Sequence, residues 1–315
     1  MNIEQKIQNN VDLAQYTTFC IGGPAKFFVE ATSTEELTAA IAWAQAKSEP
    51  VFILGGGSNV LVNDEGVKGL VIKLANTDLS VAGEAITAGA GVSLGLVVEF
   101  VKDNNLTGLE WAVGIPGTMG GGTRGNAGAY GGCLADNIKE VLAYDIAQHN
   151  FVTMTKEDCN FGYRDSIFKH CDNNLVIWQV TLTLSRGVMD KIKAVMAQYS
   201  TSRLSTQTEY PSAGCVFKNL TADDLAKLNS AVYQKAEAAG KIKGGKLACG
   251  YIIDLLGLKG QQVGGAIVGP HHGNFIVNKD SAKAEDVKTL IAQIKKQVKE
   301  KFNIDLQEEV QYFGF

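Results

Sequence analysis

The sequence lacks the long apolar runs that would place it in a membrane. None of its 315 residues falls in a run that approaches 18 consecutive apolar residues, and a spanning helix needs about 20. The N-terminal segment, residues 1–16, has no apolar core of the kind that secretory signals carry. We therefore expect a chain that neither crosses a membrane nor is exported, and we expect it in the cytoplasm.

Cysteine and histidine patterns typical of metal sites are also missing. The six cysteines show no CxxC spacing, and the four histidines show no metal-ligand spacing. His271 and His272 are adjacent, but no partner lies near them in the sequence. We predict reduced thiols, no disulfide framework and no metal site. The cysteines are Cys20, Cys133, Cys159, Cys171, Cys215 and Cys249.

An excess of positive charge is absent as well. Lysine and arginine total 29 against 33 aspartates and glutamates, which leaves a net charge of −4. Nucleic acids and acidic membrane surfaces favour basic partners, so neither is expected to bind. The composition is otherwise that of a globular protein, 45% hydrophobic and 20% charged. The length suffices for two or three domains.

What the sequence has in abundance is glycine, with 35 residues. Nine of them lie in residues 114–132, GIPGTMGGGTRGNAGAYGG. Such density costs backbone entropy, and it is tolerated where the backbone takes positive φ or approaches a ligand closely. A second segment, GGGSN at 55–59, follows the apolar run 51–54. Bare backbone N–H groups in such loops bind phosphate, so two of them together predict a ligand with a diphosphate.

Other interpretations of these glycines are open. Residues 240–247, GKIKGGKL, approach a P-loop, but Leu247 stands where magnesium binding needs a hydroxyl, and no apolar strand precedes the segment. Residues 120–125 fit a GxGxxG pattern with Asp145 downstream, as in a Rossmann unit, but they follow a Pro-Gly loop and not a strand. GGGSN alone is also typical of a tight turn.

Periodicity predicts an α+β fold. A capping box of Ser33 and Glu36 predicts a helix up to about residue 47. With strands at about 24–30, 51–54 and 67–74, it forms a small strand–helix–strand unit. Residues 79–90 are β-like, and strands over 139–147, 151–154 and 175–184 predict a larger antiparallel or mixed sheet. Further helices are expected over 93–104, 188–203, 221–239, 246–256 and 284–302, before a closing strand.

Three side chains suggest chemistry, and each also has a simpler interpretation. Arg164, in FGYRDSIFK, is suited to clamp a carboxylate or stabilise enolate charge, or to form a surface ion pair with Asp165. Cys215 is either a thiol acid or nucleophile presented on a turn, or a small buried apolar residue. Glu309 is either catalytic or a solvated side chain on a terminal strand.

In the order and content of its motifs, the chain closely resembles the UDP-N-acetylenolpyruvoylglucosamine reductase family, flavoenzymes that complete UDP-N-acetylmuramate for bacterial peptidoglycan. The motifs are TTFCIGGPA, ILGGGSNVL, GIPGTMGG, NAGAYGG, FGYRDSIFK, PSAGCVFKN, GYIIDLLGLKGQQVGGA, NFIVN and LQEEV. The resemblance implies an FAD-binding domain of the vanillyl-alcohol-oxidase (PCMH) type over 1–203, with subdomains of about 1–76 and 77–203. A substrate-binding domain would follow over 204–315, its last strand returning Glu309 to the active site. No insertion carries the tyrosine loop of the family's longer form, so the chain resembles the shorter form.

The resemblance also implies the chemistry. NADPH would reduce a non-covalently bound FAD, and hydride would pass to the enolpyruvyl group of a UDP-sugar. Arg164 would stabilise the enolate charge, Glu309 would polarise the carboxylate, and Cys215 would donate a proton. A monomer that binds small molecules is expected. The implied cofactor contacts are Gly55, Gly56, Gly57, Ser58, Asn59, Gly117, Thr118, Gly120, Gly121, Asn126, Ala127, Gly128 and Tyr130. The implied substrate contacts are Tyr163, Arg203, Lys218, Asn219 and Lys259.

The sequence departs from the family pattern at several positions. Cys215 stands where serine is usual, and a thiol with a pKa of about 8.5 is the easier proton donor at neutral pH. Thiolate would accumulate as the pH rises. Gln307 and Glu308 replace a usual Glu-Pro, which leaves Glu308 as an alternative to Glu309. Arg124 is also unusual in the glycine segment.

Two other functions are open. One is an oxidase or dehydrogenase of the same flavin fold that acts on another substrate. Against it, no histidine-bearing motif of a covalent flavin is visible. The other is a flavin or sugar-nucleotide sensor without turnover, which would not need Arg164, Cys215 and Glu309 as a set.

Overall fold

The computed structural model describes residues 3–171, 174–204 and 208–315. The chain forms two compact units, and neither is continuous in the sequence. Unit 1 comprises Met1–Val11, Ala25–Gly56 and Val67–Ser205, and unit 2 comprises Asp12–Pro24, Gly57–Gly66 and Thr206–Phe315. The predicted boundary after residue 203 lies next to the end of unit 1, but two short N-terminal segments belong to unit 2. The mixed helix and strand content confirms the predicted α+β class.

A small four-stranded sheet and one helix form the first part of unit 1 in the described residues. In the part of the chain that the structure describes, the strand order is β1 (Gln8–Asp12), β2 (Pro24–Ala31), β5 (Val67–Leu74) and β3 (Val51–Leu54). β5 runs parallel to both β2 and β3. Helix α1 (Thr34–Ala46) connects β2 to β3, and Ser33 Oγ caps it by accepting the N–H of Glu36 at 3.3 Å. This is the predicted strand–helix–strand unit.

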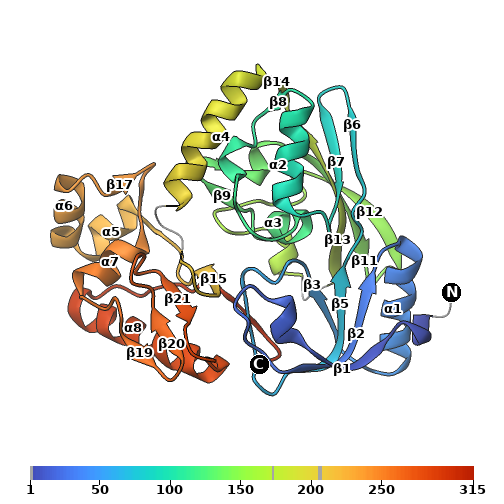
Figure 1. Ribbon diagram of the computed structural model, residues 1–315, viewed down its shortest axis with the longest axis horizontal. Helices are drawn as coiled ribbons and strands as arrows, with labels where there is room; N and C mark the ends of the chain where they lie inside the picture. The colour runs from blue at the N-terminus through green and yellow to red at the C-terminus, as the bar shows by residue number, and fades with distance from the viewer. Residues whose placement is uncertain (1–2, 172–173, 205–207) are drawn as a thin grey trace. The chain divides into compact units, whose positions relative to one another are not determined.

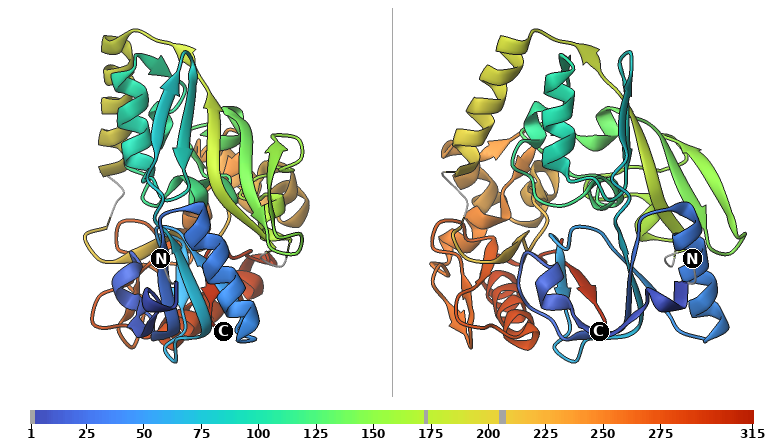
Figure 2. Two further views of the ribbon diagram at one scale, coloured as in Figure 1. Left: turned by 90° about the vertical axis from the view of Figure 1, so that its right-hand side faces the viewer. Right: turned by 45° about the vertical axis from the view of Figure 1, so that its right-hand side comes forward.

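A larger antiparallel sheet forms the second part of unit 1. Among the described residues, its strand order is β12 (Asn150–Thr155), β11 (Ile138–Asp145), β13 (Leu175–Thr183), β7 (Ala85–Gly89) and β6 (Leu79–Ala82). Helices α2 (Leu94–Asp103) and α4 (Met189–Leu204) lie side by side on one side of this sheet (Figures 1 and 2). Val97, Val98 and Val101 of α2 are buried at helical spacing, and they join one apolar core with both sheets.

Short elements complete unit 1. They are η1 (Ile3–Gln5), β8 (Leu106–Thr107), η3 (Glu110–Ala112), α3 (Met119–Arg124), β9 (Gly128–Ala129), β10 (Gly132–Cys133), η4 (Leu134–Asp136), η5 (Ile167–Lys169) and β14 (Ser185–Arg186). The glycine-rich segment 114–132 is therefore not all loop, because it contains the short helix α3.

Unit 2 is built on an antiparallel sheet in the order β15 (Ser212–Cys215), β21 (Phe275–Asn278), β20 (Ala266–Val268) and β19 (Gln262–Val263), as far as the described residues show. Helix α8 (Ala284–Phe302) packs against β19 and β20 (Figure 1). Its remaining elements are η2 (Leu13–Tyr16), β4 (Val60–Val62), β16 (Leu220–Thr221), α5 (Ala222–Leu228), α6 (Ser230–Ala238), β17 (Ile242–Lys243), β18 (Lys246–Leu247), α7 (Cys249–Leu255) and β22 (Gln311–Phe313).

The two N-terminal segments are structural parts of unit 2. Strand β4 pairs in parallel with β22 near the C-terminus. Asp64 caps α8, since its carboxylate accepts the backbone N–H groups of Ala284 at 2.8 Å and Glu285 at 3.2 Å. Phe19 and Leu61 are fully buried in the core of unit 2.

Two predicted helices differ from the structure. The helix predicted over 221–239 is broken at Asn229, which is extended with φ −154° and caps α6 by accepting the N–H of Val232 at 3.0 Å. The helix predicted over 246–256 begins only at Cys249. Its first residues form β18, which pairs with β17 across Gly244 and Gly245, and both glycines have positive φ.

Candidate functional site

Parts of the two glycine-rich segments predicted from the sequence, Gly55 and Gly56 of one and Gly117 and Thr118 of the other, come together in unit 1. A Cβ added to Gly56 would stand 2.7 Å from Gly117 Cα and 3.2 Å from the backbone nitrogen of Thr118. A Cβ added to Gly55 would stand 2.9 Å from Thr118 Oγ1. A side chain at Gly56 would displace backbone, so the end of β3 and the segment at 117–118 present bare main chain to each other.

Asn126 ties the longer glycine segment to the FGYRDSIFK segment. It is 7% exposed and has a positive φ of 41°. Its Nδ2 donates to the carbonyl of Gly162 at 2.8 Å, and its Oδ1 accepts the N–H of Ala135 at 3.1 Å. Ser166 Oγ donates to the carbonyl of Arg124 at 2.7 Å. The predicted cofactor residue Asn126 therefore also anchors the turn that carries Arg164.

Tyr163 and Arg164 form the tip of a tight turn in unit 1. Gly162 and Asp165 close it, since each donates its N–H to the carbonyl of the other, at 3.0 and 3.3 Å. Arg164 has a positive φ of 54°, and its carbonyl accepts Lys169 Nζ at 2.7 Å. A left-handed conformation costs an arginine about 1–2 kcal/mol, so the rest of the turn must impose it. Strain of this kind is typical of functional sites.

Asp165, the predicted surface partner of Arg164, binds His170. Both of its carboxylate oxygens lie 2.9 Å from His170 Nε2. Partial burial acts to raise the pKa of Asp165, but the hydrogen bond and charge of His170 outweigh it, and the pKa falls below its ordinary value. His170 is therefore one hydrogen-bonding partner of this carboxylate.

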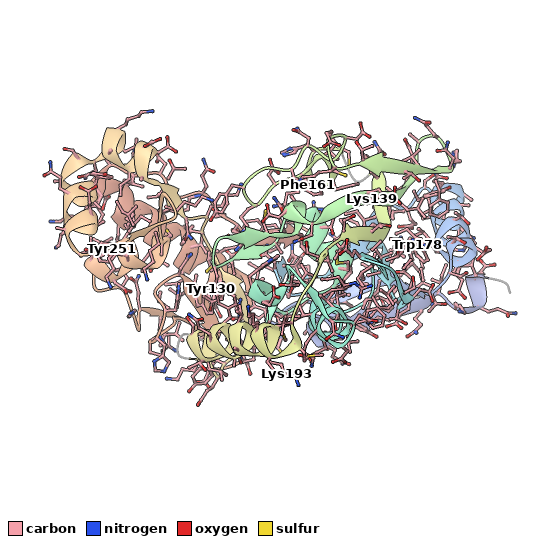
Figure 3. The ribbon with its side chains drawn as sticks, turned by 90° about the horizontal axis from the view of Figure 1, so that it is seen from above. Tyr130, Lys139, Phe161, Trp178, Lys193 and Tyr251 are labelled. Carbon is pink, nitrogen blue, oxygen red and sulfur yellow. The ribbon has the colours of Figure 1, made fainter. Side chains whose placement is uncertain are left out.

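Tyr130 and Arg203, predicted to contact cofactor and substrate, are neighbours in unit 1. The ring of Tyr130 stacks on that of Tyr199 with centroids 4.5 Å apart, and Arg203 Cζ lies 5.6 Å from the Tyr130 centroid. Figure 3 shows Tyr130 beside α4, the helix that carries Lys193. Arg203 Nε also donates to the carbonyl of Val113 at 2.9 Å. Tyr199 was not predicted; its spacing of four from Arg203 on one helix is the signal that points to it.

Cys215 and Glu309 lie on neighbouring segments of unit 2. Glu309 donates its backbone N–H to the carbonyl of Val216, the residue after Cys215, at 2.7 Å. Cys215 is half-buried. It lies near Cys249, whose pKa is raised well above its ordinary value, first by the burial of Cys249 and then by the charge of Cys215. Asn59, from the GGGSN segment, donates Nδ2 to the carbonyl of Glu309 at 3.2 Å. The structure thus brings two of the three predicted catalytic residues to one place in unit 2.

Glu308, the alternative to Glu309, is engaged elsewhere in unit 2. Its carboxylate forms an ion pair with Lys295 Nζ at 2.5 Å and accepts the hydroxyl of Tyr312 at 2.5 Å. Burial and this carboxylate raise the pKa of Tyr312, so the phenol stays protonated as the donor. These contacts favour Glu309 as the catalytic carboxylate.

The predicted substrate residues of unit 2 have partners in the protein. Lys218 donates its backbone N–H to the carbonyl of Gln307 at 2.8 Å. Asn219 Oδ1 accepts the N–H of Cys249 at 3.1 Å, at the start of α7, and Lys259 pairs with Asp254 at 3.0 Å. Their roles toward a substrate stay predictions.

Gly57 and Ser58 complete the GGGSN segment in unit 2. Gly57 has a positive φ of 61°, and an added Cβ would stand 2.0 Å from the carbonyl oxygen of Tyr16. Its carbonyl accepts the N–H of Thr18 at 3.1 Å. Glycine is therefore required at position 57 both by conformation and by contact.

Arg124, which the sequence left without a role, is half-buried in unit 1. Burial lowers its pKa from the ordinary value, and the nearby Cys171 and Asp165 partly offset this. Over residues 3–171, 174–204 and 208–315, no three His, Cys, Asp or Glu side chains cluster as metal ligands would. Within the same ranges, no helix combines the length and the apolar character that crossing a membrane requires.

Comparison with known proteins covers nearly the whole chain. Residues 206–313 match the family described as UDP-N-acetylenolpyruvoylglucosamine reductase, C-terminal domain, and residues 25–152 match the FAD binding domain. The chain is 36% identical over 313 residues to the UDP-N-acetylenolpyruvoylglucosamine reductase of Clostridium novyi (strain NT), covering 99% of this chain and 93% of the relative. For that of Staphylococcus aureus (strain JH9) the identity is 36% over 312 residues, covering 98% and 93%. The crystal structure of UDP-N-acetylenolpyruvylglucosamine reductase from Thermus caldophilus matches with a TM-score of 0.78 at 33% identity, covering 98% of both chains.

Proposed function

Because the chain belongs to the UDP-N-acetylenolpyruvoylglucosamine reductase family, we propose that it reduces UDP-N-acetyl-3-O-(1-carboxyvinyl)-glucosamine to UDP-N-acetylmuramate, a peptidoglycan precursor. NADPH is the hydride donor and FAD the cofactor. The observation that carries this function is the approach of Gly55 and Gly56 to Gly117 and Thr118 in unit 1. Two separate glycine segments pack backbone against backbone, and we infer that their bare main chain forms one cradle for a diphosphate.

The residues of this cradle fit FAD. An added Cβ at Gly56 would clash with the backbone of Gly117 and Thr118, so the two segments are in direct backbone contact there. When bound, FAD takes a hydride from NADPH and supplies one to the substrate. The residues that would hold it are Gly55, Gly56, Gly57, Ser58, Asn59, Gly117, Thr118, Gly120, Gly121, Asn126, Ala127, Gly128 and Tyr130.

Three side chains act on the enolpyruvyl group in this proposal. The guanidinium of Arg164 stabilises the negative charge that develops on the carboxylate once hydride has added to the methylene carbon. Glu309 polarises that carboxylate through a hydrogen bond. The Cys215 thiol donates its proton to the carbon beside the carboxylate, and the thiolate is then reprotonated by water. The electron pair of the hydride and one proton together saturate the double bond.

The finer assignments belong to the same proposal. Tyr163, Arg203, Lys218, Asn219 and Lys259 contact the UDP-sugar. Residues 1–203 serve as the FAD domain and 204–315 as the substrate domain. The protein works in the cytoplasm as a monomer, on small molecules alone.

An anaerobic flavin titration tests the function. One equivalent of NADPH should bleach the flavin band near ~450 nm, and the enolpyruvyl UDP-sugar should restore it promptly. A Cys215→Ala variant should bleach equally well and recover slowly. A wild-type protein that bleaches without recovery would point to another flavin substrate or to a sensor. A colourless protein would contradict the assignment of both glycine segments.

A further inference from the structure

Asn274 is a deeply buried polar side chain in unit 2, directly before β21, and only 1% of it is exposed. A buried amide is costly unless its donors and acceptor are satisfied. Its Oδ1 accepts the N–H of Phe217 at 3.0 Å, and its Nδ2 donates to the carbonyl of the same residue at 2.8 Å. The carboxamide therefore pairs with the backbone of Phe217 as a neighbouring strand residue would.

The side chain of Asn274 extends the pairing of β15 with β21 beyond Cys215. β15 and β21 pair at Ser212 and again at Cys215, but the register shifts between them, where Gly214 takes a positive φ of 75°. After Cys215, the N–H of Val216 donates to the carbonyl of Asn274 at 2.9 Å. The backbone and the side chain of Asn274 thus hold the two residues that follow Cys215.

The same segment meets the chain around Glu309 on its other edge. The carbonyl of Val216 accepts the N–H of Glu309 at 2.7 Å, and Phe217 forms a bridge with Glu308. Val216 and Phe217 are each 1% exposed. Because buried side chains are close-packed, a displacement of either residue would also shift its neighbours. Movement at Asn274 would therefore alter the register between Cys215 and Glu309.

We propose that Asn274 is a positioning residue that holds Cys215 and Glu309 in register on the substrate. This inference rests on the proposed function, because it concerns the step that both residues serve. A residue that merely supports the fold would not act on that step in particular. Loss of its carboxamide should slow the substrate half-reaction and spare the reduction of flavin by NADPH.

Asn278, the last residue of β21, provides a matched control. Its Oδ1 accepts the N–H of Ala282 at 2.8 Å, and its Nδ2 lies 3.2 Å from the carbonyls of Phe19 and Cys20. It thus makes comparable hydrogen bonds, none of them to the segment after Cys215. Asn278→Ala should lower stability without a specific loss in the substrate half-reaction.

The experiment compares wild type, Asn274→Ala, Asn274→Asp and Asn278→Ala as FAD-loaded proteins in stopped flow. For Asn274→Ala, flavin reduction by NADPH should stay within about twofold of wild type, whereas reoxidation by substrate should fall at least about tenfold. Asn278→Ala should reoxidise within about twofold of wild type. Urea unfolding of each variant measures how far stability alone accounts for the change.

Asn274→Asp supplies a readout that a purely structural role would not move. Its ionised carboxylate would face the carbonyl of Phe217 without a donor, and protonation would restore one. Reoxidation by this variant, relative to wild type, should therefore recover as the pH falls. Four other titratable side chains lie on the surrounding segments: His272, whose Nδ1 accepts the N–H of Asn274 at 3.2 Å, and Cys215, Cys249 and Glu309. All four are present in wild type, so rates are compared as ratios at each pH.

Three results would overturn the inference. The first is wild-type reoxidation by Asn274→Ala, and the second is an equal loss in Asn278→Ala at matched stability. The third is a pH-independent ratio for Asn274→Asp, which decides alone should Asn274→Ala not fold. A wild-type protein that substrate cannot reoxidise overturns the proposed function and this inference with it. Wild-type turnover with any of the three results overturns the inference only.

Discussion

At the scale of single residues, the neighbours of Gly56 leave no room for a side chain at that position. Its φ lies outside the left-handed range, so an alanine there would be conformationally acceptable. The obstacle is the backbone of Gly117 and Thr118, which an added Cβ would approach to 2.7–3.2 Å. Gly95 in α2 is the opposite case, because nothing lies within 4 Å of an added Cβ. Comparing substitutions at Gly56 and Gly95 therefore distinguishes the specific backbone contact at Gly56 from the general effect of replacing a glycine.

We expect Gly56→Ala to lose flavin and Gly95→Ala to keep it. The methyl group of the first would separate the two glycine segments, and FAD affinity should fall at least about tenfold. The second should gain about 0.5–1 kcal/mol of stability, since glycine is unfavourable within a helix. Flavin content by absorbance and urea unfolding check both. A Gly56→Ala protein with wild-type FAD affinity would contradict the cradle.

Cys215 leads to a chemical prediction. In a Cys20→Ser background, which removes an exposed thiol, iodoacetamide should inactivate the enzyme faster as the pH rises, because the thiolate reacts. Cys159 should react slowly, since burial raises its pKa to about 12. Adding Cys215→Ser should prevent inactivation and move the alkaline decline of turnover to higher pH. An unchanged alkaline decline would show that Cys215 is not the proton donor.

At the scale of elements, the start of α1 combines a cap with a charge. The carboxylate of Glu36 accepts the N–H and the hydroxyl of Thr32, at 3.0 and 2.8 Å, and pairs with Lys6. The hydrogen bond from Lys6 comes first among the causes that lower the pKa of Glu36 from 4.5 to about 2. Its side chain is only 17% exposed, which limits screening by solvent.

The stability contributed by Glu36 should therefore depend on pH. A carboxylate whose folded pKa is depressed stabilises the protein above its unfolded pKa, and this is lost as the pH falls from 4.5 towards 2. Glu36→Gln should lower the free energy of unfolding at pH 7 by about 1–2 kcal/mol. The difference should shrink below pH 4.5 in urea titrations. Glu35→Gln, at a fully exposed neighbour, should change little; an equal effect there would refute the assignment.

At the scale of the whole molecule, unit 2 depends on segments far away in the sequence. Residues 12–24 and 57–66 supply the buried side chains of Phe19, Ile21 and Leu61 to its core. Its last strand, β22, pairs with β4 from the second segment. Large buried side chains of this kind each contribute several kcal/mol, against a typical domain stability of about 5–15 kcal/mol.

A fragment of residues 208–315 should therefore not fold cooperatively alone. It lacks the buried side chains of both N-terminal segments, and β22 would lose its partner. Thermal unfolding followed by circular dichroism should show a broad change for the fragment and a cooperative transition for the full chain. A full-length Phe19→Ala variant should lose about 3–5 kcal/mol. A sharp transition in the fragment would contradict this dependence.

The sequence alone determined the features that depend on short stretches of chain. Ser33 and Glu36 predicted the start of α1, the apolar spacing predicted α8 over its full length, and the glycine density of 114–132 predicted backbone approached closely. These follow from local rules of capping, periodicity and backbone conformation. The ordered motifs likewise identified the family, because each is a local string of residues.

Only the tertiary structure decided features in which distant residues meet. Asn229 breaks a predicted helix while its Nδ2 donates to the carbonyl of Phe302 at 2.8 Å, a residue that its own sequence neighbourhood cannot reveal. The contact of Gly56 with Gly117, the stacking of Tyr130 on Tyr199 and the pairing of Asn274 with Phe217 are of the same kind. Periodicity reports which face of an element is buried, but not what that face meets. Those partners depend on how the whole chain packs.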